Sequence, residues 1–147
     1  MRKLVALLVI ALPLIAWAEG KPLPRSLDAF GIPVAVALDS DVPALKSVKG
    51  DFVRSGRFMT IDPKNGRQLS VTLDPKEKRA IKIVIRVKED EFNKIVKKAK
   101  DLYSEGNQYA TEKQKRYESH IWKDKNTIVK MICSRKQCRL ELENREE

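Results

Sequence analysis

Residues that commonly carry out catalysis are scarce in this 147-residue chain, which has two cysteines and one histidine. Zinc enzymes hold their metal with several His, Cys or acidic ligands, and His120 has no second histidine with which to share a metal. The sequence has no G-x-S-x-G nucleophile motif and no glycine-rich phosphate loop before a helix. We therefore expect no metal and no cofactor.

Long hydrophobic runs are also missing, except at the start of the chain. Two basic residues precede the apolar run 4–15, and Ala16 and Ala18 follow it in an A-x-A frame. This pattern is typical of a secretory signal peptide covering residues 1–18. A membrane anchor is the alternative, but the run is shorter than the roughly 20 residues that span a bilayer, and it contains Pro13. The mature chain, 19–147, would then have no transmembrane segment and would be periplasmic or secreted.

Acidic residues are outnumbered by basic ones. The chain has 30 Lys and Arg against 20 Asp and Glu, and without the two basic residues of the leader the formal charge falls from +10 to +8. A surplus of this size favours anionic partners, such as an anionic envelope component or an acidic protein. Nucleic acid is not expected, because an exported protein seldom meets it. The alternative is a solvated, lysine-rich surface that keeps the protein soluble.

The clearest structural signal is an amphipathic helix over 89–106. Its first three residues are acidic, which suits the positive end of a helix dipole, and Gly106 can end the helix in a left-handed conformation. The apolar residues recur at spacings of three and four, which places them on one face. They are Phe92, Ile95, Val96, Ala99, Leu102 and Tyr103.

Two groups of three strands flank this helix, because the apolar period changes from 3.6 to two on both sides of it. Asn65 and Gly66 form a strong hairpin signal between the first two strands. The expected strands are 52–61, 67–73 and 79–88 before the helix, and 117–123, 127–133 and 138–143 after it.

A short strand-like piece at 34–38 is expected to lead into a second helix, which is capped by Asp39 or Ser40, has Pro43 in its first turn and ends just before Gly50. Alternatively, residues 38–49 are all loop.

The remaining segments lack a regular period. Residues 20–33 read as an extended lead-in, and 107–116 as a polar loop or a frayed helical extension. The predicted fold class is therefore a single α+β domain over 19–147. Two helices pack on a mainly antiparallel sheet of about six strands, in the order α-βββ-α-βββ.

Cys133 and Cys138 flank a predicted turn between two neighbouring strands. Such strands can bring their Cα atoms within the roughly 4.4–6.8 Å that a disulfide needs, and an exported chain meets an oxidising compartment. We expect a structural disulfide. A redox pair would more typically read C-x-x-C, and a metal site would need further ligands.

His120 lies in a predicted strand with Glu118 and Trp122 on the same side. With Glu118 as an orienting carboxylate, His120 could act as a general base, which would make the protein a small envelope hydrolase. The alternative is an ordinary surface or half-buried strand histidine. We favour a non-enzymatic exported binding domain, because no nucleophile–base pair is apparent.

The basic residues form the other candidate site. If the fold gathers them on one side, they would bind anions, with Tyr109, Tyr117 and Trp122 available for stacking. Otherwise lysines simply occupy every exposed face. The predicted anion-binding set is Lys94, Lys97 and Lys98 on the central helix and Arg135, Lys136 and Arg139 around the last turn, and Lys113, Lys115 and Arg116 supply further charge.

Overall fold

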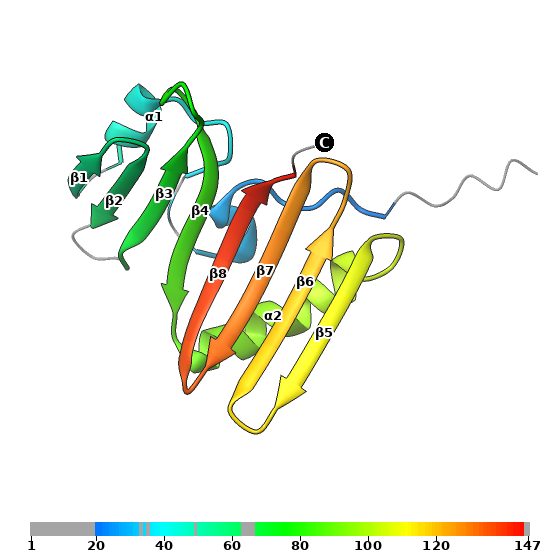
Figure 1. The fold of residues 1–147 in the computed structure, drawn as a ribbon. Coiled ribbons are helices and arrows are strands. Elements are labelled where there is room, and N and C mark those ends of the chain that lie inside the picture. The colour runs from blue at the N-terminus through cyan, green and yellow to red at the C-terminus, as the bar shows by residue number, and fades with distance from the viewer. Residues whose placement is uncertain (1–19, 33, 35, 49, 63–66, 146–147) are drawn as a thin grey trace, which may run out of the picture.

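A computed structural model describes residues 20–32, 34, 36–48, 50–62 and 67–145 (Figure 1). The expected leader and the Asn65-Gly66 turn lie outside the described residues. Within the described ranges, no helix is long and apolar enough to cross a membrane.

Eight strands form one sheet in which every neighbouring pair is antiparallel. Two four-strand meanders meet where the last strand pairs with the fourth, so the order across the sheet is β1-β2-β3-β4-β8-β7-β6-β5. The strands are β1 (Asp51–Ser55), β2 (Phe58–Asp62), β3 (Leu69–Leu73), β4 (Ala80–Val87), β5 (Gln108–Gln114), β6 (Tyr117–Lys123), β7 (Thr127–Ser134) and β8 (Gln137–Asn144).

Among the described residues the only long helix is α2 (Glu89–Tyr103), which connects β4 to β5. It packs on β7 and β8, and in Figure 1 it lies behind these strands. Phe92, Val96, Ala99 and Tyr103 are its buried residues, as its 3.6-residue period predicts. The opposite face of the sheet carries no described helix, an arrangement that antiparallel sheets tolerate.

The N-terminal segment completes the covering layer. It contains the short 3-10 helix η1 (Leu27–Phe30) and leads to α1 (Val42–Lys46). Phe30 lies against the C-terminal half of α2 beside Ala99 and Tyr103. Leu23 and Leu27 are buried in the same hydrophobic core as α2 and the sheet.

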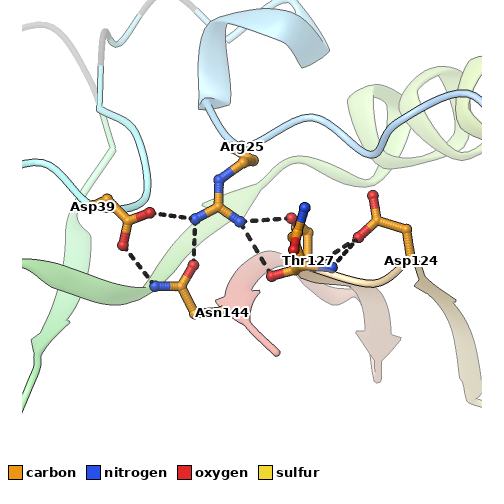
Figure 2. A network of polar contacts seen from close by, with 6 residues as sticks. Arg25, Asp39, Asp124, Thr127 and Asn144 are labelled. Carbon is orange, nitrogen blue, oxygen red and sulfur yellow. Dashed lines mark hydrogen bonds and ion pairs between the residues drawn. The ribbon is translucent and has the colours of Figure 1, made fainter. Parts of the chain in front are cut away.

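Arg25 fastens this segment to the ends of β7 and β8 (Figure 2). One guanidinium nitrogen donates to the Asp39 carboxylate at 2.6 Å and to the Asn144 side chain. The other donates to the Thr127 hydroxyl at 2.8 Å and to the Asn126 carbonyl at 3.1 Å. The Asn144 amide in turn donates to Asp39 at 2.9 Å. The planar guanidinium thus joins the lead-in, the segment before α1 and the last hairpin.

Asp124 reinforces the same corner. Its carboxylate accepts hydrogen bonds from the backbone amides of Asn126 and Thr127, and also from the amide of Leu23 at 2.8 Å. A single side chain therefore shapes the β6–β7 turn and holds the lead-in against it.

The predicted fold class is wrong. The structure is close to all-β, with eight strands in one sheet and one long helix, and it does not contain two helices on a six-strand sheet. The helix expected between its cap at Asp39 or Ser40 and Gly50 is only the five residues of α1, and its N-cap is Asp41. Asp39 adopts a positive φ of 65°, which a helix cannot contain.

One extra strand comes from the segment expected as a single strand at 52–61. Gly56, with φ of 58°, reverses the chain between Ser55 and Phe58, so that β1 pairs with β2. A glycine inside an apparent strand was the sequence signal for this reversal.

The other extra strand is β5, which was expected as a loop or helical extension. Its burial pattern is exposed at every position except Tyr109, because it forms the outer edge of the sheet beside β6. An edge strand with solvent on both faces shows no apolar alternation, so the sequence pattern does not mark it as a strand.

Candidate anion-binding site

A groove of about 580 Å³ opens at the end of the sheet where the β5–β6 turn, the β7–β8 turn and the start of α2 come together. Figure 1 shows both turns and the first residues of α2 at this end. Two half-buried residues, Glu118 and Cys133, and the buried Phe92 line its inner part. Its exposed lining includes five cationic side chains: Lys113, Lys115, Arg116, Arg135 and Lys136.

The β7–β8 turn consists of Arg135 and Lys136, between the paired residues Ser134 and Gln137. Both have positive φ, 50° and 66°, as a two-residue hairpin turn of the primed type requires. Glycine and asparagine are the usual residues here, since other side chains cost roughly 1–2 kcal/mol each in this conformation. Two long cationic side chains are therefore displayed at some expense to stability.

A disulfide closes the hairpin directly behind this turn. Cys133 and Cys138 lie opposite each other in the β7–β8 register and are bonded. The backbone amide of Arg135 also donates a hydrogen bond to the Arg116 carbonyl at 2.9 Å, which ties the turn to its neighbour. The disulfide and this backbone hydrogen bond thus fix the backbone positions from which the cationic side chains project.

The charges in the groove do not cancel. Glu89 and Glu118 are its acidic residues, and Lys113 forms an ion pair with Glu118 at 3.6 Å. Within the described part of the chain, the other four cations of the groove have no acidic partner within 4 Å. The first turn of α2 is itself acidic and offsets the helix dipole, so the side chains provide the positive potential.

His120 lies next to this groove but not in its lining. It is 4% exposed and lies on the face of the sheet that α2 covers, where its ring is close to those of Tyr109 and Trp122, which also stack on each other. Its Nδ1 is 2.7 Å from the Tyr109 hydroxyl and 3.2 Å from that of Thr111. Burial lowers the pKa of His120, and the nearby Glu118 carboxylate opposes this only in part. The neutral imidazole is therefore the favoured form near neutral pH.

Glu118 connects the histidine to the groove. One carboxylate oxygen lies 3.5 Å from Nε2 of His120, and the other faces Lys113. Nε2 is buried and has no hydrogen-bond partner among the residues that the structure describes. Sequence reasoning paired Glu118 with His120, but it did not place Glu118 among the cations of the β5–β6 hairpin.

The structure divides the predicted anion-binding set among three places. Arg135 and Lys136 line the groove together with Lys113, Lys115 and Arg116. Lys94, Lys97 and Lys98 are exposed on α2 and do not line it. Arg139 lies on the opposite face of the sheet and pairs with Glu141 at 2.9 Å. The grouping across two hairpin tips depends on strand order, which the sequence pattern did not reveal.

The aromatic residues expected to contact a partner are differently placed. Trp122 is fully buried and donates from its indole nitrogen to the Ser104 hydroxyl at 3.0 Å. Tyr109 packs on His120, and Tyr117 lines the groove. Among the described residues, no group of three or more His, Cys, Asp or Glu side chains is placed to hold a metal ion.

No protein-family model matches this chain, and neither a curated protein nor a solved structure shows significant similarity to it. Its function must therefore be inferred from the groove itself.

Proposed function

We propose that the protein is a small, exported, non-enzymatic binding domain that holds an anionic partner in the groove between its two hairpin turns. The observation that carries this proposal is the convergence of Lys115, Arg116, Arg135 and Lys136, none of which has an acidic partner among the described residues. Anionic oxygens that enter the groove would meet several exposed donors at once. The partner is an anionic envelope component or an acidic protein.

The fixed backbone supports binding at this place. The disulfide and the Arg135–Arg116 hydrogen bond hold the two turns before any ligand arrives. A ligand then has to order only the side chains, which lowers the entropic cost of association. Arg135 and Lys136 also keep left-handed conformations that glycine would adopt more easily, and such strain is often found at functional sites.

The second candidate, a hydrolase that uses His120 with Glu118, gains no comparable support. A general base must come within hydrogen-bond reach of the substrate. The His120 side chain is 5% exposed and lies outside the groove lining, so a substrate held by the cations would not touch it.

Export rests on the leader pattern of residues 1–18 and is compatible with the Cys133–Cys138 pair at disulfide distance. Intact-mass measurement of protein recovered from the cell envelope tests it. A mass that begins at Glu19 supports the proposal, and a mass that still contains Met1 contradicts it.

The test of the groove compares two variants with the same charge change. One is Lys115→Gln with Arg116→Gln in the groove, and the control is Lys94→Gln with Lys97→Gln on the outer face of α2. The measurement is salt elution from phosphocellulose, with circular dichroism to confirm folding. Each lost contact to a phosphate should make the affinity fall less steeply with added salt.

We expect the groove variant to elute at clearly lower salt than the wild type, and the control variant to elute close to it. Equal shifts for the two variants would mean that net charge, not the groove, governs retention, and the proposal would be wrong.

A further inference from the structure

The hairpin formed by β1 and β2 concentrates exposed apolar side chains. Four large hydrophobic side chains are exposed in the described part of the chain, and three of them belong to this hairpin. They are Phe52, Val53 and Phe58, with exposed fractions of 40%, 70% and 65%. A position at the edge of the sheet does not by itself explain these exposed apolar side chains, because the strand at the opposite edge has none.

The two edges of the sheet contrast in composition. β5, at one edge, is QYATEKQ and carries no exposed large hydrophobic residue. β1, at the other edge, is DFVRS, is exposed along its whole length and, among the described strands, pairs with β2 alone (Figure 1). Unpaired backbone groups along an edge strand are a template for another strand, and proteins usually block such edges with charge. The β1 edge combines an open backbone with apolar side chains.

We propose that β1 is a self-association edge, at which β1 of a second copy adds antiparallel and extends the sheet across a two-fold axis. In an antiparallel pair, opposed residues place their side chains on the same face of the sheet. In two identical strands related by a two-fold axis, this requires the axis to pass through a residue and not between two residues. Centring it on Val53 pairs all five residues of the strand. Centring it on Arg54 would set two like charges opposite each other, which is unfavourable.

The side chains fit the register centred on Val53. Phe52 lies opposite Arg54 of the second copy. Lys46 already lies over the Phe52 ring at 5.4 Å and the Arg54 guanidinium pairs with Glu77 at 3.3 Å, so the apolar stem of Arg54 is the part that can pack against the ring edge. Asp51 lies opposite Ser55, whose hydroxyl can donate to the carboxylate. Val53 meets its own counterpart, and Phe58, on the same face of the neighbouring strand, extends this apolar contact. No pair of opposed residues carries charges of the same sign.

This interface is small, since each copy contributes five strand residues and the side chains beside them. Contacts below about 1,200 Å² are typical of weak and transient complexes. The copies are both cationic, so added salt should screen their mutual repulsion and strengthen the association. That direction is opposite to the one expected for anion binding in the groove, and the two activities are therefore separable.

The test introduces a positive charge in one variant and a negative charge in another, both at the residue on the two-fold axis. Val53→Lys and Val53→Glu each place like charges against each other in a dimer of one variant, but an equimolar mixture restores an attractive pair. Val53 is largely exposed, so neither change disturbs the core. Ala110→Lys on the β5 edge is the matched control, because it also places a lysine at an exposed edge position.

Sedimentation velocity at protein concentrations up to about 1 mM, where weak association is populated, gives the readout. We expect a concentration-dependent dimer for the wild type and for Ala110→Lys, monomers for each Val53 variant alone, and a dimer for their mixture. The proposal is overturned by a wild type that stays monomeric throughout, by Val53→Lys that associates like the wild type, or by a mixture that remains monomeric. It is also overturned if Ala110→Lys abolishes the dimer to the same extent.

Discussion

The backbone amide of Arg135 donates a hydrogen bond to the carbonyl of Arg116 at 2.9 Å, and this contact joins the tips of the β5–β6 and β7–β8 hairpins at one end of the sheet. Each tip displays two adjacent cations, so the bond fixes one pair relative to the other. Because it involves only backbone atoms, the side chains can be changed without removing it. The groove can therefore be dissected by substitutions that alter charge or backbone conformation separately.

A substitution in the β7–β8 turn should separate stability from binding. Arg135→Asn with Lys136→Gly introduces the residue types that favour positive φ, and it relieves a cost of roughly 1–2 kcal/mol per residue. We expect the unfolding midpoint in urea to rise while retention on phosphocellulose falls, because two cations are lost. The measurements are urea unfolding by circular dichroism and salt elution of the same samples.

The control for that turn is Lys136→Gly alone, which keeps Arg135 and should give an intermediate result in both assays. A double variant that is less stable than the wild type would contradict the view that the native turn is strained. A double variant that binds as well as the wild type would remove the turn from the site.

Removal of the disulfide should loosen the same hairpin. In the chain-entropy treatment, a loop as short as that between Cys133 and Cys138 gives about 2 kcal/mol of stabilisation. We expect Cys133→Ala with Cys138→Ala to lose about this much free energy of unfolding in urea, and to bind phosphocellulose more weakly because the turn is less fixed. The reduced wild-type protein is the control and should behave like the double variant. Unchanged unfolding of the double variant would show that the cross-link adds nothing to the native hairpin.

Protonation of His120 should make the native state less stable in mild acid. Its pKa lies below the ordinary 6.5 in the folded chain because the ring is buried, whereas the unfolded chain takes up the proton near 6.5. The stability that this group contributes is therefore full above about pH 6.5 and is lost as the pH falls towards the folded pKa. Glu118 favours the charged ring, and Lys100 and Lys113 oppose it.

The measurement is the urea midpoint between pH 7.5 and 5 for the wild type and for His120→Gln. Gln keeps a polar group near Tyr109 but does not titrate. The wild type should lose stability more steeply over this range, while protonation of carboxylates affects both proteins alike. Parallel curves would show that His120 is not responsible.

Much of the second half of the fold could be predicted from the sequence, because its elements each bury one face. The acidic residues before the apolar period predicted the start of α2 at Glu89, and the bounds expected for β6 match the observed ones. β5 was missed because an edge strand buries almost nothing. The reversal at Gly56 was missed because β1 and β2 together resemble one longer strand.

The groove could be predicted only in part. Arg135 and Lys136 were identified as cations beside a turn, but their association with Lys115 and Arg116 depends on the pairing of β6 with β7. The period of a strand determines which face a residue occupies, but it does not determine which hairpin tips are neighbours. The sequence also grouped Lys94 and Arg139 with these cations, because the strand order that separates them is not visible in the pattern. Lys94 lies on the outside of α2, and Arg139 lies on the opposite face of the sheet.

The guanidinium of Arg25 donates hydrogen bonds to four partners from three separate segments. Arg25→Ala removes these bonds and leaves the fully buried Thr127 without one of its donors. Because the guanidinium is partly exposed, water compensates for some of the loss, and we expect a decrease in the free energy of unfolding of about 1–2 kcal/mol.

Arg25→Lys is the matched control, since it keeps the positive charge near Asp39 but lacks the planar fork that reaches several acceptors at once. We expect its stability, measured by urea unfolding, to fall between those of the wild type and Arg25→Ala. Limited proteolysis should cut the lead-in of Arg25→Ala faster than that of the wild type, because this segment is tied to the β6–β7 turn and the end of β8 through Arg25. If Arg25→Lys equals the wild type, charge alone is sufficient. If Arg25→Ala also equals it, then burial of Leu23 and Leu27, and not this network, holds the segment in place.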